Sequence, residues 1–375
     1  MELKIDEKCT GCGACVADCP VGVLALANGR PTVRADKSDR CMNCRHCLAA
    51  RNLYVHFPFC RTKCSYCALY SRPGVGAEER AEYVRRLAER IGEGGAFSTV
   101  YFGGGSPALC DLRPAFDALA VGPDAEFTVE LHPLDVTDET LATLKAGGVN
   151  RISMGVQSLD DATLAAMGRG YTVREAEAAF AKVRRTFDNA GIDLIVGYPG
   201  DPCGGWARLR DWGLQHCSVY SLQNERGLEN VPDDDFMLDR IREAAAFLDG
   251  IGLRRYEISN YAVPGRECRH NLAVWRGEDY LGLGDGACGR IGLRRTRGFG
   301  GSHPAEETLT PEADALERRI FRLRTREGLD ATGREDWAKA LAPSVAEGLL
   351  VKEGEIYRLT PRGAEVCDAI LSELV

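Results

Sequence analysis

The chain has 375 residues, a formal net charge of −8, 45% hydrophobic residues and 27% charged residues. This length allows one large domain with one or two small ones, and the composition is that of an ordinary globular protein. The acidic balance argues against a general nucleic-acid binder. No apolar run is long enough for a membrane span, and the N-terminal stretch lacks the apolar centre of a signal peptide. We therefore expect a cytoplasmic protein in which the 16 cysteines are reduced thiols or metal ligands.

Residues 1–51 are predicted to form a ferredoxin-like α+β module. The first cysteine run reads C-x2-C-x2-C-x3-C and is followed by Pro20, which is the spacing of bacterial ferredoxins, and a second run follows it. The apolar segment between the two runs predicts a hairpin that turns at Asn28-Gly29. A pair of zinc knuckles is the alternative. The predicted cluster ligands are Cys9, Cys12, Cys15, Cys19, Cys41, Cys44 and Cys47.

The second run lacks its fourth cysteine, because Arg51 stands at that place. In two-cluster ferredoxins each fourth cysteine ligates the other cluster, so Cys19 completes a cube with the second run. Three states stay open for the cluster of the first run: a [3Fe–4S] cluster, a ligand taken from elsewhere in the chain, or no cluster. Only a few residues separate Cys47 from the next strand, so the module is a candidate electron donor to the following domain. A structural cap is the alternative.

Residues 53–67, LYVHFPFCRTKCSYC, predict a strand that leads into a loop with three cysteines, Cys60, Cys64 and Cys67. Three thiolates on one short loop can hold three irons of a [4Fe–4S] cube and leave the fourth iron without a protein ligand. The alternative is a zinc loop, but zinc loops usually pair two C-x2-C halves, and no second half follows downstream.

Further along, strand-like runs alternate with amphipathic helices, which predicts parallel βαβ units. One helix is expected after Gly76 and another over residues 173–187. Functional residues should then lie at the C-terminal ends of the strands. The strands are expected near residues 53–57, 98–102, 126–131, 150–154, 192–196 and 217–222.

From about Asn52 to the C-terminus the sequence resembles the radical S-adenosylmethionine (radical SAM) superfamily, in its branch of oxygen-independent coproporphyrinogen oxidases and haem chaperones (the HemN/HemW type). The resemblance rests on the three-cysteine loop and on VYFGGGSP, VELHP, VNRISMGVQS, LAAMGRGYT, IDLIVGYPGD, RYEISNYAVPGRECRHNLAVW and YLGLGDGA. It implies a partial (β/α)6 barrel over residues 52–290 and a winged-helix-like domain over 291–375.

The same resemblance implies that SAM binds the open iron and a set of barrel residues. By this resemblance the SAM contacts are Tyr54, Tyr66, Gly104, Gly105, Ser106, Glu130, Gln157, Arg169, Asp193, Leu222 and Cys288. Taken singly, Asp193 could instead cap a loop and Arg169 could form a surface ion pair. His56 lies two residues from Tyr54 and therefore on the same face of the strand, where it contacts ligand or has a structural role.

A haem site is the further implication. His270 lies in the segment that ends in Trp275, and the resemblance makes it a candidate haem ligand; the alternative is a histidine bonded to backbone in a loop. Two departures weaken this haem site: Val274 replaces a tyrosine of the family, and Cys288 replaces a histidine.

The C-terminal region begins with a Gly- and Arg-rich segment that predicts a solvated loop. Pairing of its arginines with carboxylates such as haem propionates is the alternative; they are Arg290, Arg294, Arg295 and Arg297. A helix over 312–325, a hairpin over 351–360 and a last helix from Pro361 should follow. The acidic balance and the absence of a basic recognition helix argue against DNA binding.

Three functions remain open: a haem-chaperone-like protein that passes haem to an acceptor protein, a radical SAM enzyme that methylates or opens a tetrapyrrole or other aromatic substrate, and an electron-transfer protein with an idle SAM site. The fused ferredoxin, itself supplied by an external electron donor, favours the enzyme, whereas the segment around His270 favours the chaperone. Leu69 stands where coproporphyrinogen oxidases have a fourth cysteine, so that reaction is disfavoured.

Overall fold

A computed structural model describes residues 24–27, 30–34, 52–92, 96–297 and 305–375. Arg51 and all the cysteines of the two ferredoxin runs lie outside the described residues. Within the N-terminal module, β1 (Leu24–Ala27) pairs antiparallel with β2 (Arg30–Val33). This pairing confirms the predicted hairpin strands, and the turn between them is likewise outside the described part.

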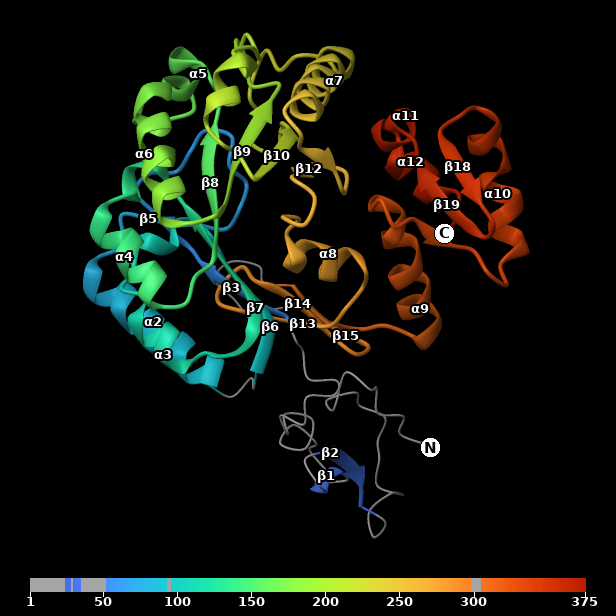
Figure 1. Ribbon diagram of the computed structural model, residues 1–375, viewed down its shortest axis with the longest axis horizontal. Coiled ribbons are helices and arrows are strands. Elements are labelled where there is room, and N and C mark those ends of the chain that lie inside the picture. The colour runs from blue at the N-terminus through green and yellow to red at the C-terminus, as the bar shows by residue number, and fades with distance from the viewer. Residues whose placement is uncertain (1–23, 28–29, 35–51, 93–95, 298–304) are drawn as a thin grey trace.

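The centre of the protein is an arc of six parallel strands that neighbour one another in chain order (Figure 1). Each predicted strand is found within a few residues of its expected place, and the arc confirms the predicted α/β architecture with a central parallel sheet. The strands are β3 (Asn52–Phe57), β6 (Ala96–Gly104), β7 (Ala120–Leu131), β8 (Arg151–Gln157), β9 (Asn189–Val196) and β10 (His216–Ser221).

Helices cover the outer face of this arc (Figure 1). Their starts follow from local capping: Thr172 and Glu175 form a capping box, and Thr137 and Asp233 accept hydrogen bonds from backbone N–H groups of the first turn. The helices are α2 (Ala77–Gly92), α3 (Arg113–Ala118), α4 (Asp138–Ala146), α5 (Asp161–Ala166), α6 (Val173–Thr186) and α7 (Asp234–Gly250).

Strand β3 shows how the two faces of the arc differ. Leu53, Val55 and Phe57 are 0% exposed and belong to the large apolar core under the helices. Because side chains alternate along a strand, Tyr54 and His56 point to the concave face. The apolar residues therefore fix the register of the strand, and that register places the polar residues inside the barrel.

Further strands extend both edges of the arc, so that the described residues form a 12-stranded sheet. On one side β12 (Asn260–Ala262) pairs antiparallel with β10, and β11 (Arg254–Arg255) pairs antiparallel with β12. On the other, β13 (Tyr280–Leu283) returns to pair in parallel with β3. Between these edges the chain forms α8 (Arg269–Trp275), and β14 (Cys288–Ile291), β15 (Arg294–Arg297) and β16 (Ala305–Thr308) continue the sheet.

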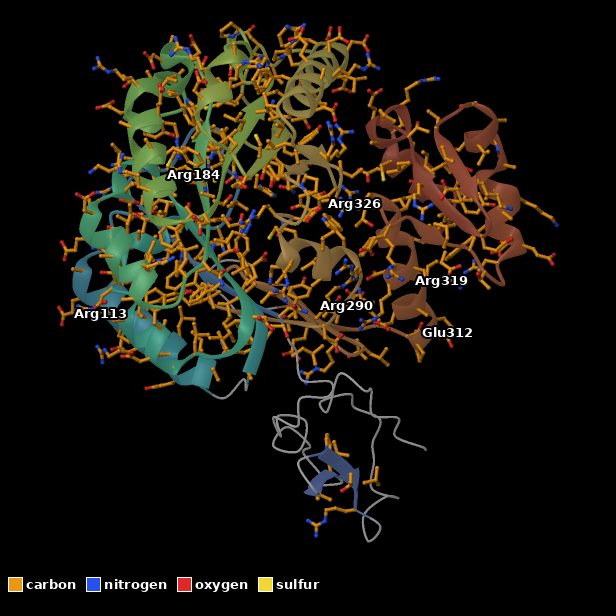
Figure 2. The ribbon with its side chains drawn as sticks, viewed as in Figure 1. Arg113, Arg184, Arg290, Glu312, Arg319 and Arg326 are labelled. Atoms are coloured by element: carbon orange, nitrogen blue, oxygen red, sulfur yellow. The ribbon has the colours of Figure 1, made fainter. Side chains whose placement is uncertain are left out.

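The prediction of a solvated loop in the Gly- and Arg-rich segment is wrong for residues 288–297, which form β14 and β15. Arg290 is buried between β14 and helix α9 (Pro311–Ile320), where its guanidinium pairs with Asp314 at 2.7 Å and Glu317 at 3.2 Å (Figure 2). Arg295 pairs with Glu307 and Glu317. Acidic partners on α9 and β16 neutralise these arginines and allow the segment to be ordered.

The C-terminal unit has a small apolar core of its own, centred on Leu323, Trp337 and Tyr357. Helix α9 continues as a 3₁₀ turn to Arg324, close to the helix predicted over 312–325. Strand β17 (Leu329–Asp330) pairs with β19 (Ile356–Leu359), which forms the predicted hairpin with β18 (Leu350–Glu353). Helices α10 (Glu335–Ala346), α11 (Pro361–Glu365) and α12 (Cys367–Ser372) complete the unit. Among the described residues, no helix has the length and apolar character needed to cross a membrane.

Candidate functional site

The three-cysteine loop begins at the C-terminal end of the first barrel strand. Cys60 ends the short strand β4 (Phe59–Cys60), which pairs with β5 (Arg72–Pro73), and Cys64 and Cys67 follow in the loop between these strands. All three thiols are free and half-buried. Burial raises the pKa of the Cys60 thiol. No group of three or more His, Cys, Asp or Glu side chains in the described part of the chain is gathered as a ready site for a single metal ion.

The glycines that end β6 let the backbone approach this loop closely. A Cβ on Gly105 would overlap the Phe59 carbonyl oxygen and lie 2.8 Å from the Cys60 Sγ. Gly104 has a φ of +113°, and a Cβ there would lie 2.8 Å from the His56 ring. Backbone bonds join the two segments, since Gly105 N donates to Phe57 O at 2.8 Å. Only glycine fits these positions, as expected where backbone and ligand loop must meet.

The Ser106 hydroxyl is hydrogen-bonded within the protein, and its predicted contact with SAM stays a prediction. Its side chain is 5% exposed and its hydroxyl donates to the carboxylate of Asp135, which also accepts from Arg61. The backbone N–H of Ser106 donates to Phe59 O at 2.7 Å. In this structure Ser106 therefore ties the glycine loop to the cysteine loop.

Two carboxylates line the concave face beside the glycine loop. Glu130, on β7, accepts from Gly104 N at 3.0 Å and from the Tyr101 hydroxyl at 2.8 Å. Asp193, on β9, accepts from the Ser153 hydroxyl at 3.1 Å. Burial, and then the negative charge of Asp193, raises the pKa of Glu130 to about 7. Burial also raises the pKa of Asp193. Two buried carboxyl groups of this kind favour a ligand with hydroxyl or cationic groups, because such groups donate hydrogen bonds to the acids or balance their charge.

Arg169 links the barrel to the cysteine loop. Its guanidinium donates to Tyr171 Oη at 2.9 Å, to Gly155 O at 2.7 Å and to Cys64 Sγ at 3.4 Å. The side chain is 8% exposed, which excludes the alternative of a surface ion pair. Gln157 lies beside it, because a Cβ on Gly155 would meet the Gln157 Nε2 at 2.5 Å and the Arg169 Nη2 at 3.6 Å.

Gln157 also has a φ of 75°, which is unusual for a residue with a side chain. Such a conformation costs about 1–3 kcal/mol and is found where the surrounding structure holds a residue in place at a functional site. Gln157 therefore lies beside Arg169 in a strained conformation, and the contact of both residues with SAM stays a prediction.

The two predicted tyrosines, Tyr54 and Tyr66, lie in different parts of the site. Tyr54 bonds to the His56 Nδ1 at 3.0 Å, and the other ring nitrogen of His56 lies 2.9 Å from Tyr70 O. His56 thus positions Tyr54 and the loop that follows the cysteines. Burial raises the pKa of Tyr66, whose surroundings include Arg169 and Cys64. Tyr54 therefore lies on the concave face and Tyr66 in the cysteine loop, and their contacts with SAM stay a prediction.

Two further predicted residues lie at the same end of the barrel. Leu222 follows β10, is 6% exposed and donates its backbone N–H to Val196 O at 2.8 Å. Cys288 is exposed on β14. The pairing of Tyr280 with Arg290 and of Gly282 with Tyr54 puts Cys288 on the face that carries Tyr54.

His270 has a structural role in this structure. It lies in α8, is 4% exposed, and its Nδ1 bonds to the Thr99 hydroxyl at 2.9 Å. The rings of Tyr101 and Tyr54 cover it, with centroids at 5.4 and 6.4 Å. His270 is therefore enclosed by protein groups in this structure, and its role as a haem ligand stays a prediction.

The sequence reasoning missed Tyr101 and Asp135. Tyr101 bonds to Glu130, and Asp135 joins Ser106 to Arg61. Alternation along β6 could have revealed Tyr101, because it lies two residues before Gly103 on the same face. No spacing in the sequence pointed to Asp135.

The described residues fit an iron–sulfur cluster bound to SAM. The three thiols are free and half-buried, the Gly105 backbone lies against Cys60, and Arg169 donates to Cys64. Acidic side chains lie on nearby strands of the barrel. The fold and the site together define a radical SAM protein. Residues 54–210 match the radical SAM superfamily, and residues 1–50 match the 4Fe-4S dicluster domain. These matches imply a [4Fe–4S] cluster with SAM and at least one further iron–sulfur cluster.

Comparison with curated proteins shows to which family within the radical SAM superfamily the chain belongs. The chain is 33% identical over 369 residues to the heme chaperone HemW of Mycobacterium tuberculosis, covering 86% of this chain and 94% of that protein. It is 30% identical to the heme chaperone HemW of Escherichia coli, covering 86% and 98%. It is 34% identical to the mitochondrial radical S-adenosyl methionine domain-containing protein 1 of Bos taurus, covering 73% and 68%. The chain belongs to the HemW family.

A solved structure supports the fold. The coproporphyrinogen III oxidase HemN from Escherichia coli, a radical SAM enzyme, matches with a TM-score of 0.73 at 21% identity, covering 86% of this chain and 89% of that one. At this identity the likeness shows a shared architecture.

Proposed function

We propose that this protein binds SAM at the cluster of Cys60, Cys64 and Cys67, and that it receives and hands over haem as its relatives' name of heme chaperone implies. The observation that carries the SAM part is the convergence on one loop: Arg169 donates to Cys64 Sγ, and the glycine loop packs on Cys60. The haem part is supported by relatives that share the family and most of their length.

In this proposal the chain's own residues hold SAM in place. Arg169 presents a guanidinium to a carboxylate, because the fork of this group suits bidentate pairing. Glu130 and Asp193 accept hydrogen bonds from hydroxyl or amino groups. When bound to Cys60, Cys64 and Cys67, the reduced cluster would supply the electron for reductive cleavage of SAM to methionine and a 5′-deoxyadenosyl radical. The N-terminal ferredoxin module is the proposed electron donor, and it takes electrons from an external partner.

The second candidate is a radical SAM enzyme that acts on a tetrapyrrole or another aromatic substrate. The fused dicluster domain favours it, because a built-in donor suits repeated reduction. Oxidative decarboxylation of coproporphyrinogen is disfavoured, since Leu69 replaces the fourth cysteine and its side chain is 59% exposed.

The deciding experiment uses the full chain reconstituted anaerobically with iron and sulfide. Haem binding without release of 5′-deoxyadenosine supports the chaperone, and release that rises with one substrate supports the enzyme. The matched control replaces Cys60, Cys64 and Cys67 together by Ala. If this variant keeps the SAM-responsive spectrum of the native protein, the proposal is wrong.

A further inference from the structure

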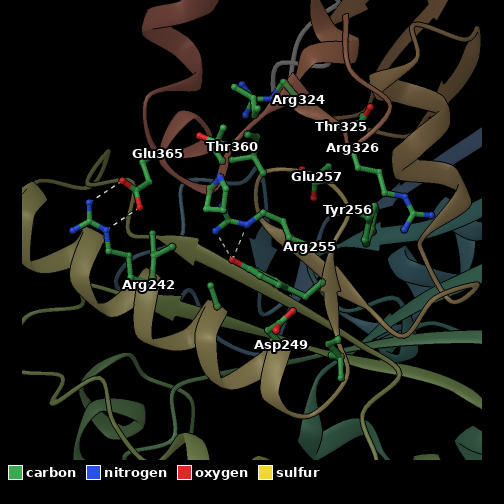
Figure 3. Close-up of a pocket in the computed structure, with 18 of the residues that line it drawn as sticks. Arg242, Asp249, Arg255, Tyr256, Glu257, Arg324, Thr325, Arg326, Thr360 and Glu365 are labelled. Atoms are coloured by element: carbon green, nitrogen blue, oxygen red, sulfur yellow. Dashed lines mark hydrogen bonds and ion pairs between the residues drawn. The ribbon is translucent and has the colours of Figure 1, made fainter. Parts of the chain in front are cut away.

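A cleft lies between the barrel and the C-terminal unit, away from the cysteine loop. One wall is helix α7 with strands β11 and β12, and the other is the 3₁₀ turn before Thr325 with β19 and α11 (Figure 3). The cavity is about 460 Å³, within the range of sites for small organic ligands. Much of its lining is apolar, including Ile241, Ala245, Leu253, Ile258, Leu359 and Pro361.

Four of the lining residues are arginines, and three of these have acidic partners. Arg242 forms a two-pronged pair with Glu365 at 2.8 Å, which joins α7 to α11. Arg326 pairs with Glu267 at 2.8 Å and Arg324 with Asp368 at 2.6 Å. The Nε of Arg324 is nevertheless buried without a hydrogen-bond partner among the described residues. The fourth arginine of the lining has no such ion pair among the described residues.

Arg255 is that fourth arginine. Its Nε donates to the Tyr261 hydroxyl at 2.9 Å, and its guanidinium lies 5.1 Å from the centre of the same ring. In the described part of the chain no carboxylate lies within ion-pair distance of Arg255. The nearby Glu257 is occupied, because its oxygens accept from Asn260 Nδ2 and Ser259 N. A half-buried guanidinium with a neutral partner retains its affinity for an anion.

We propose that this cleft binds an amphipathic carboxylate, with its apolar body between α7 and β19 and its carboxylate on Arg255. An apolar neutral molecule would leave the Arg255 guanidinium without a direct ion-pair partner, and a small inorganic anion would leave the apolar walls uncovered. A carboxylate on an apolar body satisfies both. The same chemistry occurs in the propionates of a tetrapyrrole and in a fatty acid. The site does not depend on the SAM site, so the two can be tested separately.

The test titrates the reconstituted full chain with metal-free protoporphyrin IX and, separately, with laurate. Arg255→Leu should weaken binding of the accepted probe about tenfold or more, the usual effect of losing a charged hydrogen bond. Arg208→Leu is the matched control, because Arg208 is exposed on the 3₁₀ turn Trp206–Asp211 outside the cleft. Binding of the porphyrin alone identifies a tetrapyrrole site, and binding of laurate alone identifies a fatty-acid site.

A second measurement needs no variant. The native chain should bind protoporphyrin IX more tightly than its dimethyl ester, and for laurate more tightly than methyl laurate, because the esters lack the charge that Arg255 pairs with. Failure of both probes to bind, equal affinity for acid and ester, or an unchanged affinity in Arg255→Leu would overturn the proposal. The change that SAM causes in the cluster spectrum should be the same in Arg255→Leu, so loss of that change would indicate failure of the SAM site instead.

Discussion

Replacing Gly105 by Ala should disrupt the cysteine loop without altering any charged group. The added Cβ would lie 2.8 Å from Cys60 Sγ and would overlap the Phe59 carbonyl. Since non-bonded carbon contacts are normally about 3.5 Å or longer, the thiol must move by about 0.7 Å. Such a displacement exceeds the roughly 0.5 Å within which functional constellations must be held. Overpacking of this kind costs about 1–3 kcal/mol.

The assay compares iron and acid-labile sulfide per chain after anaerobic reconstitution, together with the spectral response to SAM. We expect Gly105→Ala to lose the iron of one [4Fe–4S] cluster and the spectral response to SAM, while the spectral signals of the ferredoxin clusters persist. Gly250→Ala is the control, because a Cβ at this exposed helical position meets nothing within 4 Å. A Gly105→Ala protein with the native iron content and SAM response would refute the close approach on which the site depends.

Three further changes test single residues. Glu130→Gln should flatten the pH dependence of stability in cluster-free protein. Because the pKa of Glu130 is raised from 4.5 to about 7, its contribution to stability is complete below pH 4.5 and is lost as the pH rises through 7, by up to about 3 kcal/mol. The urea midpoints of native and variant protein should therefore diverge between pH 5 and 8. Arg169→Lys loses the guanidinium fork and should weaken SAM binding about tenfold or more in an EPR titration; an unchanged affinity would contradict the assigned role. His270→Ala should leave the haem affinity unchanged and lower the free energy of unfolding by about 1–3 kcal/mol, because Thr99 loses its buried partner. Weaker haem binding at native stability would instead support His270 as a haem ligand.

The strands and the cluster loop were predictable because they rest on local patterns. A run of residues that favour strands located β3, and the spacing of Cys60, Cys64 and Cys67 follows from chemistry within one loop. The site residues from later strands came through resemblance to a family, since no local period connects Arg169 with Cys64 across 105 positions.

Tertiary contacts explain the wrong loop prediction and the burial that the sequence did not show. Arg290 was assigned to a solvated loop because its partner Asp314 lies 24 residues later, where no sequence pattern joins them. The burial of His270 likewise could not be predicted from its motif, because it results from Tyr54 and Tyr101 on two distant strands. In both cases tertiary contacts determine the role of the side chain.

The pairing of β13 with β3 affects how the protein can be made. Asn52, at the start of β3, donates to Asp279 O at 3.0 Å, across a separation of 227 residues. The strand that leads to the cluster loop therefore keeps an open edge until the ribosome has released the chain beyond Leu283, and joining such distant segments is slow. Insertion of the iron–sulfur cluster should follow translation of most of the chain, and truncated chains that end before β13 should expose an unpaired strand edge and aggregate.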